Sequence, residues 1–185
     1  MASKIGLVSN ALILIGGLPL TSLTGNSRAQ VVANNLYDNI VAHELTKHRW
    51  GFARKKAQLA KINADPVGTE YSSMYQLPSD LLTLIKLNPN LPYQVLGDRV
   101  YCNYSGDLYC DYIYDVSEAD YPAYFTKMLE YALAKDFALA ISESATIKDA
   151  MAREYLNASQ MARNTDSQQH PTTPIQSRPF IDVRF

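Results

Sequence analysis

The residues with the clearest potential for metal chemistry are two histidines and a glutamate. They occur as His43-Glu44-x-x-x-His48. A helical zinc site with a glutamate base needs its histidines four residues apart, so that both lie on one face. Here the spacing is five, which places the two rings about 140° apart around a helix of 3.6 residues per turn. We therefore predict no metal at this segment, and no third ligand at a suitable spacing points to a cofactor.

Carboxylates are the second candidate for chemistry, because two of them at a suitable separation can act as the acid and base of a hydrolase. The pattern around Asp107, Asp111 and Asp115 favours another interpretation. These three acids fall on one side of a predicted strand and apolar side chains fall on the other. The apolar side comprises Leu108, Cys110, Tyr112, Tyr114 and Val116. We predict that the three acids form an exposed face, toward solvent or a channel, that repels nucleic acid.

The sequence contains no glycine-rich phosphate loop, no nucleophile elbow and no Ser/His/Asp set in a supporting context. We therefore predict that the protein is not an enzyme. Tyrosine is the unusual residue, since many of the 13 tyrosines crowd residues 93–124. Strand propensity and core packing are one explanation. The other is a subunit interface, where rigid amphipathic rings are favoured, and its candidates are Tyr93, Tyr104 and Tyr109.

Length and charge limit the class of protein. A chain of 185 residues fits one domain, or one domain with an arm. A net charge of −1 argues against a protein that wraps duplex DNA. The charges are nevertheless segregated, with a basic stretch over residues 47–61 and nine acids against Lys86 and Arg99 over residues 65–120. Two ends of the molecule are therefore expected to meet different surroundings. Cys102 and Cys110 are interpreted as reduced thiols of a protein made in a cytoplasm, and no apolar run reaches the length of a membrane span.

The elements that must position these residues follow from periodicity and punctuation. Ser3 can cap a first helix that ends at Gly16-Gly17, and Ser27-Arg-Ala-Gln30 has the form of a capping box for a second. Short extended runs follow from Trp50, with a hairpin turn at Gly97-Asp98. Helices return at Pro122 and near Thr146. We predict an α+β fold: a four-helix bundle (residues 1–49 and 120–165) with an inserted antiparallel β-sheet (residues 50–119) and an extended C-terminal arm (residues 166–185).

The arm combines three prolines with small polar residues and lacks periodicity. It cannot bury enough surface to offset its own ordering entropy, so we expect a partner surface to hold it. Its last residues alternate like a strand seeking an edge, with Phe180, Ile181, Val183 and Phe185 as apolar anchors. The alternative is that the arm packs on its own domain.

Three motifs in order resemble one family. They are Asn10-Ala-Leu-Ile-Leu-Ile-Gly-Gly-Leu-Pro-Leu-Thr-Ser-Leu23, a helix closing in Arg49-Trp50-x-Phe52, and Leu77-Pro78-Ser-Asp80-Leu-Leu. In this order they resemble the tail tubular protein A family of short-tailed bacteriophages, the head-to-tail adaptors or connectors. The likeness covers roughly residues 5 to 165 and supports architecture more strongly than any contact.

The resemblance implies a homo-oligomeric ring, a dodecamer, under the portal protein, with its sheet toward the tail tube or nozzle protein. Duplex DNA would pass through the ring without specific binding during ejection. The protein would be a structural part of the virion tail, assembled in the host cytoplasm, with no membrane insertion of its own. Trp50 and Phe52 would be an aromatic anchor between helix and sheet. The arm lies outside the part that resembles the family, and on physical grounds alone we expect it to dock on the portal or on an adjacent subunit. The alternative function is a virion-associated, carboxylate-dependent hydrolase acting on the host cell surface.

Overall fold

The computed structural model describes residues 2–64, 66 and 68–169. Its helices are α1 (Lys4–Leu14), α2 (Arg28–Thr46), α3 (Ala123–Ser142) and α4 (Ala145–Gln168), with a short 3₁₀ helix over Glu118–Asp120. The predicted caps are confirmed: Ser3 accepts a hydrogen bond from the Gly6 amide, and Ser27 and Gln30 form a capping box. Gly16, with φ of +81°, follows α1 in the left-handed conformation that a glycine permits.

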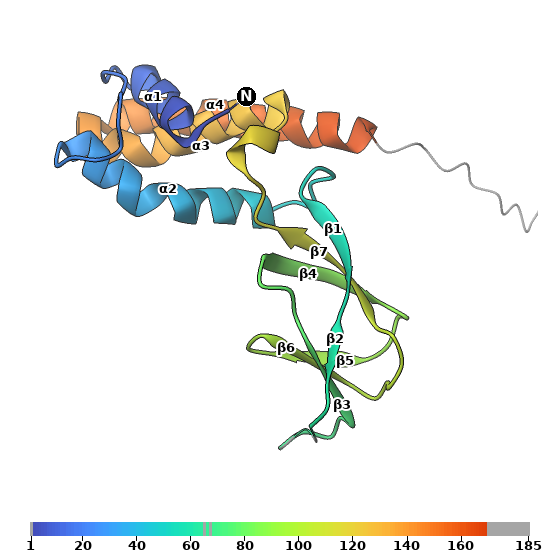
Figure 1. Ribbon diagram of the computed structural model, residues 1–185. Coiled ribbons are helices and arrows are strands. Elements are labelled where there is room, and N and C mark those ends of the chain that lie inside the picture. The colour runs from blue at the N-terminus through green and yellow to red at the C-terminus, as the bar shows by residue number, and fades with distance from the viewer. Residues whose placement is uncertain (1, 65, 67, 170–185) are drawn as a thin grey trace, which may run out of the picture.

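The α+β class is confirmed, but the predicted four-helix bundle with an inserted sheet is wrong. Helix α3 lies at the centre of the helical part and packs against α1, α2 and α4, whereas α1 and α2 barely touch each other (Figure 1). A bundle helix buries one stripe, but the buried residues of α3 cover most of its circumference. Helix α4 buries only a narrow stripe against α3 and lies outermost. The helices are therefore arranged around α3 and do not share a common bundle axis.

The β part contains two antiparallel sheets where one was expected. The first has the order β1-β7-β4, from β1 (Arg54–Gln58), β7 (Tyr109–Tyr114) and β4 (Leu81–Asn88). The second has the order β2-β3-β6-β5, from β2 (Ala60–Ile62), β3 (Ser73–Gln76), β6 (Arg99–Cys102) and β5 (Tyr93–Leu96). The predicted hairpin joins β5 to β6, and Gly97 has a φ of +61° at its first turn position.

Two hydrophobic cores result, and β7 contributes to both. Ile113 of β7, and Val116 just beyond the strand, belong to the core that buried residues of α1, α2 and α3 also form. Cys110 and Tyr112 point the other way, into a core between the two sheets. Because successive side chains of a strand point to opposite faces, a central strand between two cores buries both of its faces. At Ile113, the face of β7 that was predicted to be wet and acidic is therefore covered by the helical core.

Figure 1 shows an L-shaped molecule, in which the helices form one limb and the β part the other. The β2-β3-β6-β5 sheet lies farthest from the helices. Helix α4 continues through Gln168, so Asp166, expected as the first residue of the arm, lies inside a helix. Residues 167–169 of the predicted arm also belong to α4 and its C-cap, and residues 170–185, including the anchors Phe180, Ile181, Val183 and Phe185, lie outside the described residues.

Candidate assembly surfaces and the junction between them

An aromatic cluster connects the two limbs. The ring of Trp50 lies 5.2 Å from that of Phe125 on α3 and 6.0 Å from that of Phe52, which in turn lies 4.9 Å from Phe125. Tyr121 and Tyr124 complete the cluster. Trp50 is fully buried, and its indole Nε1 donates to the carbonyl oxygen of Glu44 at 2.9 Å. The predicted aromatic anchor is confirmed as a packed joint between α2, α3 and the start of the β part.

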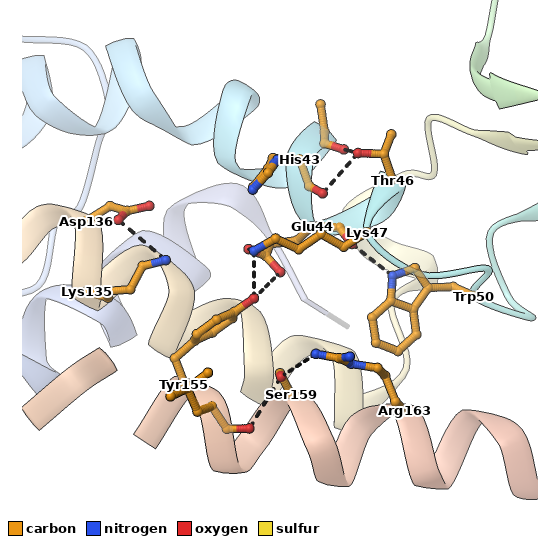
Figure 2. A network of polar contacts seen from close by, with 12 residues as sticks. His43, Glu44, Thr46, Lys47, Trp50, Lys135, Asp136, Tyr155, Ser159 and Arg163 are labelled. Atoms are coloured by element: carbon orange, nitrogen blue, oxygen red, sulfur yellow. Dashed lines mark hydrogen bonds and ion pairs between the residues drawn. The ribbon is translucent and has the colours of Figure 1, made fainter. Parts of the chain in front are cut away.

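A buried polar network reinforces this joint beside Trp50 (Figure 2). The carboxylate of Glu44 on α2 accepts from the hydroxyl of Tyr155 on α4 and from Nζ of Lys47, both at 2.8 Å. Lys47 also donates to the Tyr155 hydroxyl at 2.8 Å. Burial alone would lower the pKa of Lys47, but the hydrogen bonds with Glu44 and Tyr155 outweigh it and raise that pKa. The three groups form a closed triangle that ties α4 to α2.

The second histidine of the His43-Glu44-x-x-x-His48 segment belongs to another contact. His48 Nε2 lies 3.6 Å from the buried carboxylate of Asp166. Asp166 also accepts from the Gly51 backbone amide and, at 2.8 Å, from the Tyr124 hydroxyl. Burial and this carboxylate together raise the pKa of Tyr124 above its usual value. Through Glu44 and His48, this segment contacts α4 and holds that helix against the joint.

The three acids of the predicted acidic face lie in different environments. Asp107 and Asp115 are exposed, as predicted. Asp111 is only 6% exposed, and its carboxylate lies 2.5 Å from Arg54 Nη2 and 3.8 Å from Lys86 Nζ. The prediction of an exposed Asp111 is wrong because β7 is the central strand, and cations from both neighbouring strands cover it.

The register of β1 and β4 against β7 brings these cations to Asp111. The sequence of a single strand does not contain this register, so the burial of Asp111 was not predicted. Lys56 of β1 and Lys86 of β4 are both directly opposite Asp111. Burial alone would raise the pKa of Asp111, but Arg54, Lys56 and Lys86 outweigh it and hold that pKa below its usual value. The centre of the expected acidic face is therefore surrounded by positive charge. Arg54 and Lys56 belong to the basic stretch of residues 47–61, which partly indicated this positive charge. Lys86 lies within the acidic region of residues 65–120, so its contribution was not indicated.

The three tyrosines predicted to lie in a subunit interface differ in their exposure. Tyr93 and Tyr109 are 37% and 43% exposed. Tyr104 is half-buried and packs against the core between the sheets, and its carbonyl oxygen accepts from the Tyr75 hydroxyl at 2.9 Å. The rings of Tyr93 and Tyr109 are therefore accessible to a neighbour, whereas that of Tyr104 mainly supports its own sheet.

Exposed apolar side chains include one group near the α1–α2 loop and one on β5, and Ile5, Leu156 and Met161 are exposed on α1 and α4 outside both groups. At the helical end, around the α1–α2 loop, the first group comprises Ile13, Leu18, Val31 and Leu139. The Arg28–Glu143 ion pair joins the start of α2 to the end of α3 at this end. At the hairpin end the second group comprises Tyr93, Val95 and Leu96, all on the edge strand β5. The helical end and the hairpin end lie on different limbs of the L (Figure 1).

The other chemical possibilities can be stated for residues 2–64, 66 and 68–169. Within these ranges no group of three His, Cys, Asp or Glu side chains could hold a metal, and no helix is long and apolar enough to cross a bilayer. The pKa values of Asp80, Asp98 and Asp111 are all lowered. A general acid requires the opposite shift. The thiols of Cys102 and Cys110 are free and buried, and burial raises their pKa values.

The sequence matches no protein-family model and no curated protein at significant similarity. Evidence on function therefore comes from the motifs and the surfaces of this chain.

Proposed function

We propose that this chain is the subunit of a head-to-tail adaptor ring in a short-tailed bacteriophage, joining the portal to the tail tube or nozzle. Duplex DNA would pass through the ring during ejection. The observation that carries the proposal is the pair of exposed apolar surfaces, the helical end and the hairpin end, on separate limbs of one subunit. Exposed apolar patches on a folded chain mark sites of protein contact.

An adaptor needs two binding surfaces that keep a fixed relative position, because each of them binds a different neighbour. The joint at Trp50 supplies this rigidity, since it fills the angle of the L with packed aromatic rings. The network of Glu44, Lys47 and Tyr155 and the contacts of Asp166 tie α4 to the same place. The resemblance of residues 10–23, 49–52 and 77–82 supports the adaptor family, and the dodecameric ring and the place in the virion tail rest on this resemblance.

Each end is assigned a neighbour. The helical end would contact the portal, and the hairpin end would contact the tube or nozzle. At the hairpin end, β5 exposes apolar side chains and is the edge strand of its sheet among the described residues, which is the geometry that accepts a strand from another protein.

The test is the mass of the assembled particle and its partners. Light scattering should detect a ring of about twelve times the 20.7 kDa subunit, alone or on adding the portal protein. Leu18→Asp should weaken portal binding, and Val95→Asp should weaken binding of the tube or nozzle protein, each leaving the other contact intact. Leu156→Asp is the matched control, because Leu156 is an exposed apolar residue of α4 outside both ends. A chain that stays monomeric with both partners, or variants that bind like the control, would contradict the proposal.

A further inference from the structure

A row of positive charge crosses the β1-β7-β4 sheet on one face. Side chains that share this face come from alternate positions of the three strands, aligned by their register. Lys56, Asp111 and Lys86 form one rung of directly opposed residues, and Arg54 lies two residues along β1 from Lys56. Arg54, Lys56 and Lys86 are exposed, whereas Asp111 is buried among them. The basic row (Arg54, Lys56 and Lys86) therefore has three cations at the surface for one carboxylate beneath it.

The carboxylate orders this row and does not neutralise it. Asp111 Oδ2 contacts Arg54 Nη2 at 2.5 Å and lies 3.8 Å from Lys86 Nζ. One buried negative charge against three cations leaves an excess of two positive charges. The rung is about 10 Å wide, because neighbouring strands are spaced about 5 Å apart. The excess charge is thus concentrated in a small area of a chain whose net charge is −1.

The next rung adds hydrogen-bonding groups. Gln58, Tyr109 and Asn88 are opposed on β1, β7 and β4, and all three are exposed. Asp107 accepts from Gln58 Nε2 at 3.1 Å and marks the far end of the row. The Tyr109 hydroxyl and the Asn88 amide carry donors of the kind that, with Arg and Lys, contact phosphate oxygens in protein–DNA complexes.

We propose that this sheet face contacts the phosphate backbone of duplex nucleic acid through Arg54, Lys56 and Lys86. Charge complementarity identifies the partner as a polyanion. The residue types favour nucleic acid over an acidic protein surface, because lysine is depleted from the cores of protein interfaces and is a principal phosphate ligand. The exposed apolar residues of the helical end and the hairpin end lie elsewhere. Under the adaptor proposal this would be the channel-facing surface of the β part, but the contact itself does not depend on a ring.

The experiment measures binding of the full chain to a fluorescently labelled duplex of about 20 base pairs, by anisotropy over a range of low salt concentrations. The double variant Lys56→Gln/Lys86→Gln removes two charges of the row and spares Arg54, which pairs with Asp111. The control Lys148→Gln/Arg153→Gln removes the same net charge from exposed positions of α4. Removing one cation that neutralises a phosphate should reduce the slope of log K against log salt by about 0.9.

We expect the Lys56/Lys86 variant to bind at least about tenfold more weakly than the wild type at low salt, with a slope reduced by nearly two, and the control to bind like the wild type. Equal weakening in both variants would mean that bulk charge alone drives binding and would overturn the proposal. So would a wild-type chain that does not bind the duplex. If Lys56→Gln/Lys86→Gln binds DNA normally but fails to assemble with itself or the portal, the row is a protein contact. The particle mass, measured separately, tests the adaptor, so either idea can fail alone.

Discussion

The carboxylate of Asp166, in the last turn of α4, accepts a hydrogen bond from the backbone amide of Gly51. Both carboxylate oxygens lie 3.1 Å from the Gly51 nitrogen. Gly51 lies in the segment that connects α2 to β1, 115 residues earlier in the chain. The end of the last helix is thus fixed to the point where the chain leaves the helical limb for the β limb.

Replacing Asp166 with alanine should destabilise the protein by about 3 kcal/mol, because the Gly51 amide and the Tyr124 hydroxyl lose a charged acceptor in a buried place. Urea unfolding gives the free energy of unfolding. The control is Asp149→Ala, an exposed acid of the same helix, for which a change within about 0.5 kcal/mol is expected. Equal effects of the two substitutions would show that the Asp166 contacts contribute nothing.

Tyr155→Phe should cost about 1 to 2 kcal/mol, because the buried carboxylate of Glu44 loses one of its two side-chain donors while Lys47 remains. The aromatic ring is kept, so the change in stability reports the hydroxyl alone. Tyr93→Phe, at an exposed ring on β5, is the matched control and should be neutral. A Tyr155→Phe protein as stable as this control would mean that Lys47 alone satisfies Glu44.

The stability contributed by Asp111 should depend on pH in a defined direction. Its pKa in the folded protein lies below the ordinary value of 3.8, because Arg54, Lys56 and Lys86 outweigh the opposing effect of burial. Its contribution is therefore fully present above about pH 4 and is lost as the pH falls through the folded-state pKa. Asp111→Asn should be less stable than the wild type by about 2 kcal/mol at pH 7, and the gap should narrow below pH 4. Urea unfolding between pH 7 and pH 3 measures it.

The control for these pH measurements is Asp115→Asn, because Asp115 is an exposed acid that directly follows β7. If the wild type and Asp111→Asn keep a constant difference at every pH, the three cations do not stabilise the ionised carboxylate.

Gly97→Ala should destabilise the β5–β6 hairpin by about 1 kcal/mol, because Gly97 has a φ of +61° and an alanine is strained there. An added Cβ would meet nothing within 4 Å, so backbone strain is the whole effect. Gly97→Asn tests this cause, since asparagine tolerates the left-handed region better than alanine and should cost less. If Gly97→Asn lowers the free energy of unfolding as much as Gly97→Ala does, the positive φ of Gly97 is not the cause of the destabilisation.

Local features of the fold could be predicted from the sequence. The Ser3 cap, the Ser27–Gln30 capping box and the Gly97-Asp98 turn all depend on residues close together in the chain, and the structure has each of them. These features depend on hydrogen bonds and φ preferences within a few residues, so neighbours in sequence determine them.

The arrangement of the elements could not be predicted in this way. Helix α3 carries an apolar stripe but also buries Ala132, Ala134 and Ala138, whose small side chains let neighbouring helices approach from several directions. A period of 3.6 residues predicts a helix with one wet face and does not reveal that α3 lies in the middle. The prediction for Asp111 was wrong for a related reason, since its partners Arg54 and Lys86 lie 57 residues before it and 25 residues before it. Alternation within one strand carries no information on such partners.

The central position of α3 also fixes an order of events on the ribosome. Helices α1 and α2 barely touch each other, and their apolar stripes are covered by α3, which begins only at Ala123. The strands of the two sheets end at Tyr114, so the whole core between the sheets can emerge from the ribosome before α3, the main partner of the first two helices, is synthesised. For the time needed to synthesise that stretch, at about 5 to 20 residues per second, side chains such as Leu7 and Val41 remain unburied on the nascent chain. Synthesis of this protein therefore includes an interval of several seconds in which the apolar stripes of residues 4–46 are made but their main partner α3 is not.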